Sequence, residues 1–247
     1  MKRLVWIMIL LAVGSSAQAQ GVALRWDSCK GLSNRNFACD RSTGSELLVG
    51  SFSPPPGIDA MSGIVMVLRI TSADGTIPGW WQMFSPGSCR PYSLSSSFDM
   101  SDQLDCDDPW GGQAFGAVAK YDFQSPNGVD VLMIAAVPEF AIRPAQAGHT
   151  YTAFKLLVNH QRSSGVGACA GCNTPMCIRL ESIEIDQPGP VDEHNVMQTR
   201  ISVLSDGISG MGGSSQVATW QGGTANCSAG LSKPSTWSQL KDRFRTH

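Results

Sequence analysis

The amino-acid sequence predicts an all-β protein, a single antiparallel β-sandwich of jelly-roll-like or Ig-like type, stabilised by disulfides. Three observations support this prediction. Apolar segments rich in β-branched residues recur along the 247-residue chain, and proline- and glycine-rich turns interrupt them. Only 15% of the residues are charged, whereas 26 are glycine and 14 are proline. No internal repeat of fixed period is present, so one sandwich explains the pattern most simply.

The expected strands differ in how much of each is apolar. Residues 22–26 are expected to form an edge strand, whereas 63–72 and 129–137 are apolar on both faces and should be central. A strand over 80–84 would place Trp80 and Trp81 on opposite faces, with one in the core and the other exposed or covered by a loop. The remaining expected strands are 46–53, 93–98, 152–158, 178–185, 201–204 and 217–221.

The apolar positions change parity within the expected strand over 178–185. Ile178 and Leu180 share one parity, whereas Ile183 and Ile185 share the other. One extra residue in a strand flips the alternation of its side chains. The sequence therefore predicts a β-bulge near Glu181-Ser182.

The two ends of the chain are expected to lie outside the sandwich, which should span residues 20–233. Lys2 and Arg3 precede the apolar run 4–13, and Ala17-Gln18-Ala19 is a small-x-small site, as in a secretory signal peptide cleaved after Ala19. The apolar run is about half as long as the roughly 20 residues of a membrane-spanning helix. The expected location is therefore secreted or periplasmic, without membrane insertion after cleavage.

A short amphipathic helix is expected over residues 234–247. Thr236 and Gln239 have the spacing of a capping box. Trp237, Leu240 and Phe244 lie at i, i+3 and i+7, so they would form one apolar stripe.

The charge of the chain argues against nucleic acid as a partner. Loss of residues 1–19 would leave 16 Lys and Arg against 20 Asp and Glu, a net charge near −4. Such a chain has no basic footprint for phosphate backbones or anionic lipids. No sequence motif indicates a cofactor.

All eight cysteines follow residue 19, and in an exported protein an even number predicts disulfides. Sequence proximity favours the pairs Cys29–Cys39 and Cys89–Cys106. The pairing of the other four stays open: Cys169, Cys172, Cys177 and Cys227.

Two other interpretations exist for this second group of cysteines. Thiolates at short spacing can bind zinc in a tetrahedral site, and Cys169-x-x-Cys172 has the spacing of a redox pair. We favour disulfides, because exported thiols usually oxidise and because no helix follows the motif to lower a thiol pKa.

Residues 99–113 are the most acidic segment and are expected to form a surface loop. Flexible acidic loops can bind calcium through carboxylate oxygens, but the spacing here does not match an EF-hand. A solvated acidic loop is the simpler interpretation. The candidate calcium ligands are Asp99, Asp102, Asp105, Asp107 and Asp108.

Exposed tryptophans next to polar residues could form a platform for a polysaccharide, since sugar rings stack on indoles. The alternative is that these side chains are ordinary core or loop anchors. The candidates are Trp80, Trp81, Trp110 and Trp220.

Catalytic motifs are scarce. The sequence contains no G-x-S-x-G, no H-E-x-x-H and no glycine-rich phosphate loop. A carboxylate pair of an extracellular hydrolase is the remaining enzymatic alternative. Its candidates are Glu46, Glu139, Glu181, Glu184 and Glu193.

Six short segments are distinctive when taken together: Trp80-Trp81-Gln82, Ser88-Cys89-Arg90, Tyr151-Thr-Ala-Phe154, Cys169-Ala-Gly-Cys172-Asn-Thr-Pro175-Met-Cys177-Ile, Trp220-Gln-Gly-Gly223 and Thr236-Trp237-x-x-Leu240-Lys241. In these segments the chain resembles a group of uncharacterised secreted bacterial proteins. The resemblance spans most of the chain after residue 19, and it implies export and a single domain but no catalytic residues. The function expected from the whole sequence is that of a non-enzymatic binding or surface-associated structural module. Its partner would be a polysaccharide or another extracellular protein.

Overall fold

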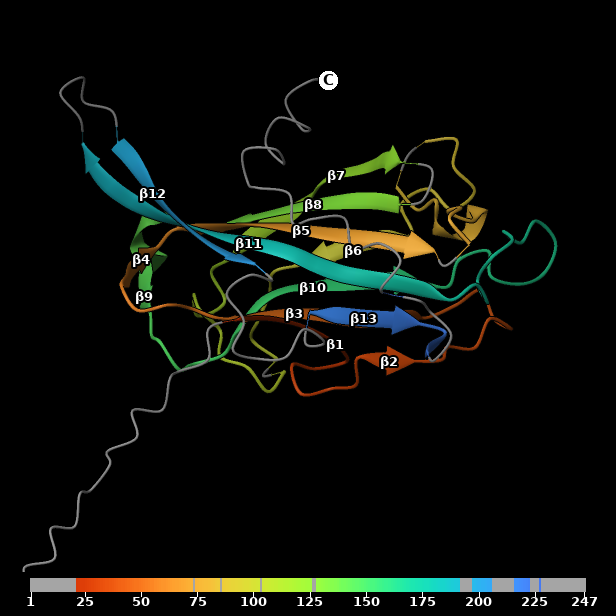
Figure 1. Cartoon of the computed structure of the whole chain (residues 1–247), viewed down its shortest axis with the longest axis horizontal. Coiled ribbons are helices and arrows are strands. Elements are labelled where there is room, and N and C mark those ends of the chain that lie inside the picture. Colours follow the sequence, from red (N-terminus) through yellow and green to blue (C-terminus); the bar gives the residue numbers. More distant parts are fainter. Residues whose placement is uncertain are drawn as a thin grey trace, which may run out of the picture.

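The computed structural model describes residues 21–72, 74–84, 86–102, 104–125, 128–191, 197–205, 216–222 and 227. Two β-sheets face each other across one hydrophobic core (Figure 1). The first sheet has the order β1-β3-β10-β6. Its strands are β1 (Gly21–Trp26), β3 (Ser45–Ser53), β10 (Tyr151–Asn159) and β6 (Leu94–Ser97).

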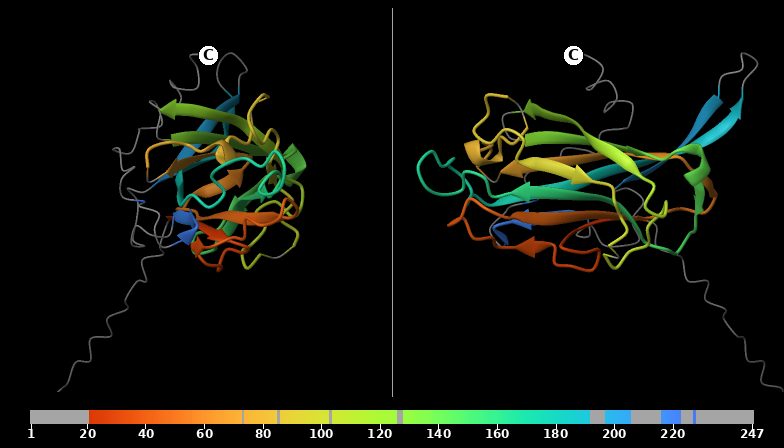
Figure 2. Two further views of the ribbon diagram at one scale, coloured as in Figure 1. Left: turned by 90° about the vertical axis from the view of Figure 1, so that its right-hand side faces the viewer. Right: turned by 180° about the vertical axis from the view of Figure 1, so that it is seen from behind.

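The second sheet is larger and has the order β2-β13-β11-β5-β8-β7, with β12 also paired to β11. All of its pairings are antiparallel except that of β2 with β13. Its strands are β2 (Asn34–Arg35), β5 (Gly63–Ser72), β7 (Phe115–Ser125), β8 (Gly128–Ala136), β11 (Met176–Val191), β12 (Met197–Ser205) and β13 (Val217–Trp220). β4 (Ile58–Met61) and β9 (Arg143–Ala145) form a separate two-stranded ladder at one end of the molecule (Figures 1 and 2).

The predicted β-sandwich is confirmed. The expected strand 63–72 is β5, which lies between β11 and β8 as a central strand should. Ile64, Met66 and Leu68 enter the core, and Val67 on the opposite face is also fully buried. The segments 1–19 and 234–247 lie outside the described residues. Within the described ranges, no helix has the length and hydropathy of a membrane span.

The predicted bulge in β11 is also confirmed. Leu180 pairs with Leu68 of β5, but the next registered pair is Ser182 with Val67, so Glu181 is the extra residue. This shift lets Ile178 and Ile183 both enter the core despite their different parity.

The expected strand over 80–84 is wrong. Gly79–Trp81 forms a single 3-10 turn, η1, in which the Trp81 N–H donates to the Pro78 carbonyl at 2.9 Å. Neighbouring side chains in such a turn point about 120° apart rather than to opposite faces. Both Trp80 and Trp81 are therefore buried in the same core.

The sequence also did not reveal β7, although it is 11 residues long. Gly116, Ala117 and Ala119 in its first half and Lys120 and Asp122 in its second half have low strand propensity, so they interrupt the pattern of its Phe, Val and Tyr residues. Its position is set instead by pairing with β8.

All eight cysteines form disulfides, as predicted, but both predicted pairs are wrong. The bonds are Cys29–Cys106, Cys39–Cys172, Cys89–Cys169 and Cys177–Cys227. Each closes at least 50 residues, because strands that are distant in sequence are neighbours in the sandwich. Proximity along the chain was therefore the wrong criterion.

Candidate functional site

Two disulfides meet at one end of the sandwich, which is at the right in Figure 1. Cys39–Cys172 ties the loop before β3 to the loop after β10. Cys89–Cys169 ties the loop after η1 to that same loop. We call residues 36–44, 86–93 and 160–175 together the clamped end. Three loops from different parts of the chain are thus covalently joined there.

Arg90 lies inside the clamped end and is fully buried. Its Nε donates to the Gln161 carbonyl at 2.7 Å, its Nη1 donates to the Trp80 carbonyl at 2.6 Å, and its Nη2 donates to the Asn159 carbonyl. The guanidinium also lies 3.4 Å from the centroid of the Trp80 ring. Desolvation lowers the pKa of Arg90 to about 9, so the group is charged at neutral pH. One buried cation thus joins η1 to the loop after β10.

Below Arg90 lies a layer of aromatic rings. The Trp220 centroid is 4.9 Å from that of Trp80, 5.5 Å from that of Trp81 and 4.2 Å from that of Phe37. The Trp220 indole N–H donates to the Cys172 carbonyl at 2.7 Å, and the Trp80 indole N–H donates to the Ser163 hydroxyl at 2.8 Å. The layer therefore packs the core and also holds the loops above it.

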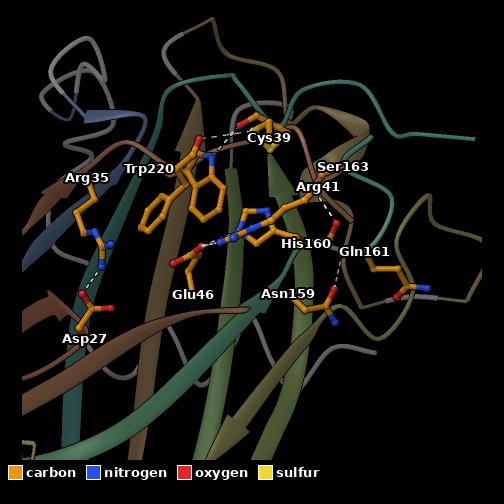
Figure 3. Close-up of polar contacts among 12 residues, drawn as sticks. Asp27, Arg35, Cys39, Arg41, Glu46, Asn159, His160, Gln161, Ser163 and Trp220 are labelled. Atoms are coloured by element: carbon orange, nitrogen blue, oxygen red, sulfur yellow. Dashed lines mark hydrogen bonds and ion pairs between the residues drawn. A yellow bond between two sulfur atoms is a disulfide. The ribbon is translucent and has the colours of Figure 1, made fainter. Parts of the chain in front are cut away.

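His160 lies against this layer and is fully buried (Figure 3). Its Nε2 is 2.8 Å from an oxygen of Glu46, which extends from the start of β3. The Glu46 carboxylate also lies 3.8 Å from the Arg41 guanidinium. Among the described atoms, His160 Nδ1 has no hydrogen-bonding partner. These contacts fix the loop before β3 to the end of β10.

The surface of the clamped end has an open depression of about 550 Å³. It is lined by Cys39, Asp74, Ser163, Cys169, Ala170, Gly171, Cys172, Asn173, Thr174 and Pro175. Elsewhere in the clamped end, Tyr92 is 70% exposed, and Val166 is fully exposed between Gly165 and Gly167, whose φ angles are 83° and 79°. The clamped end therefore combines a rigid base with exposed side chains.

The structure contradicts the tryptophan platform. Trp80, Trp81, Trp110 and Trp220 have no exposed area, so none can present a ring to a sugar. Trp110 lies apart from the other three, and its indole N–H donates to the Met61 carbonyl at 3.0 Å. The interpretation of these residues as core and loop anchors is the one that their burial supports.

The acidic segment does not converge on one point, and the described residues contain no group of acidic side chains suited to a metal ion. Asp102 pairs with Lys155 at 2.8 Å, and Asp107 pairs with His149 at 2.7 Å. Asp108 accepts hydrogen bonds from two backbone N–H groups, those of Trp110 and Gly112.

The other candidate ligands in this segment are Asp99 and Asp105. Hydrogen bonds from the hydroxyl and the backbone N–H of Ser101 lower the pKa of Asp99. Asp105 has a φ of 63° and is exposed. Both features are those of a solvated surface loop.

The zinc and redox interpretations of the cysteine-rich segment are wrong. Cys169, Cys172 and Cys177 each bond to a different distant cysteine, and Cys227 bonds to Cys177. No thiol is left to bind a metal or to exchange with its neighbour.

The four described glutamates proposed for a hydrolase lie on three elements. Glu46 is on β3 and pairs with His160, Glu139 is in the turn η2 (Glu139–Ala141), and Glu181 and Glu184 are on β11. None of these four lines the depression at the clamped end. Glu193 lies outside the described residues.

The sequence did not indicate that Arg90 and His160 are central residues of the clamped end. Arg90 follows Cys89 in an irregular loop, where no periodic pattern distinguishes a buried arginine from a surface one. The sequence does not show that His160 is buried either. It follows directly after β10, so the alternation of side chains along the strand no longer indicates which way it points.

Comparison with known proteins adds little to this description. No family model matches the chain, and no curated protein matches it. One similar solved structure is a cohesin module from a Clostridium perfringens ATCC13124 family 33 glycoside hydrolase. That match has a TM-score of 0.32 and 7% sequence identity, and it covers 76% of this chain and 96% of the module. A likeness at this level assigns neither a family nor a function.

Proposed function

We propose that the protein is an exported, non-enzymatic binding module that holds a partner protein at the clamped end. The observation that supports this is the combination of loops tied by two disulfides and one buried cation with exposed side chains at their surface. Loops that are ordered before binding lose little entropy in a complex. Tyrosine is also among the residues that contribute most to protein interfaces, and Tyr92 is exposed there.

Export is supported by the four disulfides, which form and persist in oxidising compartments. The signal peptide ending at Ala19 and membership of a group of uncharacterised secreted bacterial proteins are further parts of this proposal. A protein partner is preferred over a polysaccharide because every tryptophan in the part of the chain that the structure describes is buried and cannot stack on a sugar ring.

The test begins with exported proteins of the native host, from which partners are captured with the purified mature protein. Binding of each captured partner is then measured for wild type, Tyr92→Asn and Val166→Ser. Asparagine tolerates the φ of 63° at position 92, so this change removes the ring without new backbone strain. Loss of a central tyrosine is expected to raise the dissociation constant about 30-fold, which corresponds to about 2 kcal/mol.

The matched control is Phe140→Ser. Phe140 is also a large exposed apolar side chain, but it lies in η2, near the end of the sandwich opposite the clamped end. It should leave the dissociation constant unchanged. Equal binding by all variants, or a loss confined to Phe140→Ser, would place the binding surface elsewhere and refute the proposal.

A further inference from the structure

Two large residues of the clamped end have exposed side chains and a backbone in the left-handed conformation. Tyr92 has a φ of 63° and Arg162 has a φ of 57°. Tyr92 is 70% exposed, and Arg162 is exposed as well. Side chains larger than Asn or Asp rarely adopt this conformation, and residues that do are concentrated at binding sites. The two residues are therefore candidates for direct contact with a partner.

The backbone next to both residues is fixed by hydrogen bonds. The Ser93 N–H donates to the Met83 carbonyl at 3.1 Å, and the Cys169 N–H donates to the Arg162 carbonyl at 2.8 Å. Tyr92 and Arg162 thus extend from backbone that is ordered before any partner binds. Such preorganisation lowers the entropy that is lost on binding.

The two segments that carry these residues lie side by side. Arg90 Nε donates to the Gln161 carbonyl at 2.7 Å, and the Ser93 hydroxyl donates to the side-chain oxygen of Gln161 at 3.3 Å. In addition, Arg162 Nη1 donates to the Cys89 carbonyl at 2.8 Å. Neighbouring loops therefore present an exposed phenol ring and an exposed guanidinium on one surface.

The guanidinium of Arg162 has N–H groups left for a ligand. Its bond to the Cys89 carbonyl uses one of its several donors and restricts how the group can turn. No carboxylate of the described residues forms an ion pair with it. The free N–H groups of a guanidinium match the two oxygens of a carboxylate.

The charge of the clamped end has the opposite sign to that of the whole chain. Its residues include three Lys or Arg against one Asp or Glu, a formal charge of +2, whereas the mature chain is expected to be near −4. The segments 86–93 and 160–175 contain no acidic residue. The charged residues of the clamped end are Asp40, Arg41, Arg90 and Arg162.

Two carboxylates border these segments, but neither is paired with Arg162. Glu46 lies against Arg41 and His160. Asp74 lines the depression, whose lining does not include Arg162. The local charge around Arg162 therefore favours an acidic partner over a basic one.

We propose that this surface binds an acidic segment of the partner protein, in which a carboxylate pairs with Arg162 and a neighbouring apolar side chain packs on Tyr92. The inference rests on the proposed function and adds the chemistry of the partner. Tyrosine and arginine are among the residue types that contribute most to binding energy. A bidentate pair with the guanidinium also fixes the direction of the carboxylate, so it gives specificity, while the ring supplies contact area.

The probe for the test is a library of random peptides displayed on phage and panned against the purified mature protein. Enriched peptides are expected to contain Asp or Glu next to an apolar residue. One of them is then synthesised in two forms, with its acidic residue and with the matching amide. The amide form should bind about tenfold more weakly, because it lacks the charge that pairs with the guanidinium.

Variants of the protein measure the same contact from the other side. Arg162→Gln should raise the dissociation constant of the acidic peptide about tenfold. Arg162→Lys should recover only part of the affinity, because an ammonium lacks the planar fork of a guanidinium. The matched control is Arg143→Gln, which removes the same charge. Arg143 is also exposed and has no ion pair among the described residues, but it lies in β9, at the end opposite the clamped end (Figure 1), so the constant should stay unchanged.

Several outcomes would overturn the inference. These are enriched peptides without an excess of acidic residues, equal binding by Arg162→Gln and wild type, or equal weakening by Arg143→Gln. Peptides that lose affinity with Tyr92→Asn but not with Arg162→Gln would refute the acidic partner alone and keep the clamped end as the binding surface. If no enriched peptide depended on Tyr92 or Arg162, or if only a soluble polyuronate bound at Arg162, the proposed function would fail as well.

Discussion

The clamped end and the acidic loop 99–113 are both irregular and are both connected to a disulfide, but the contacts that hold them differ in burial. In the clamped end, Arg90 bonds to carbonyls 69 and 71 residues away along the chain. In the acidic loop, the long-range ion pairs are made by half-exposed carboxylates, those of Asp102 with Lys155 and of Asp107 with His149.

The disulfides of the two regions differ in burial as well. Cys169 and Cys172 are in the core, whereas Cys29 and Cys106 are half-buried. Buried contacts are shielded from water, whereas an ion pair at the surface contributes little to stability. We therefore expect changes in the clamped end to destabilise the fold more than changes around the acidic loop.

The two disulfides Cys89–Cys169 and Cys29–Cys106 make the strongest test of this difference. They close 80 and 77 residues, so the loss of either should release nearly the same chain entropy, about 4–5 kcal/mol of unfolding free energy. Cys89→Ala with Cys169→Ala also leaves a void in the core, where Cys169 is buried and Cys89 packs against it. This double variant should therefore be less stable than Cys29→Ala with Cys106→Ala by about 1 kcal/mol.

Urea unfolding of both double variants measures this comparison. If the two double variants had equal urea midpoints and equal slopes, the clamped end and the acidic loop would contribute equally to stability.

Replacing the buried cation is expected to have the next largest effect. Arg90→Met leaves three backbone carbonyls without their charged donor, that of Trp80 in a fully buried contact, which should lower the unfolding free energy by about 3 kcal/mol. Arg90→Lys should recover only part of this, since an ammonium cannot reproduce the planar fork of a guanidinium.

A second buried cation serves as the control. Lys155 pairs with Asp102 of the acidic loop, whose side chain is 50% exposed. Lys155→Met leaves that carboxylate in water, so it should lower the unfolding free energy by no more than about 1 kcal/mol. If both methionine variants were equally destabilised, the carbonyl contacts of Arg90 would not be important for stability.

The smallest expected effect is a dependence of stability on alkaline pH. Tyr121 donates its hydroxyl to the Trp81 carbonyl beneath the clamped end, and burial raises the pKa of Tyr121. Above about pH 10, unfolded Tyr121 releases its proton and the folded residue keeps it, so the unfolded state binds fewer protons. The unfolding free energy should therefore fall as pH rises through 10, at about the ordinary tyrosine pKa.

Tyr121→Phe removes this contribution, so wild type should lose stability faster than the variant between about pH 9.5 and about pH 11. The shift of Arg90 has the opposite sign, since its lowered pKa makes the folded state release the proton first. Parallel pH profiles for wild type and Tyr121→Phe in urea unfolding would mean that Tyr121 is not buried as described.

Several features of the fold were predictable because their signal is local. β5 is apolar on both faces, which is enough to predict a central strand. The parity change between Leu180 and Ile183 predicts the bulge in β11, since side-chain alternation is a property of the strand itself. The even number of cysteines after residue 19 likewise predicts that all are bonded.

Features that depend on neighbours from distant parts of the chain were not predictable. β7 is a strand because β8 pairs with it, not because of its own residues. The tryptophans are buried because η1 turns both of its indoles inward against Trp220 of β13.

The sequence by itself thus determined the fold class, the central strands, the bulge and the presence of disulfides in this protein. Only the tertiary structure decided which cysteines bond, where Arg90 and His160 lie, and which surface remains exposed. The physical reason is range: propensity, alternation and composition act within a few residues. Disulfide partners and buried polar contacts instead depend on which strands the two sheets place side by side.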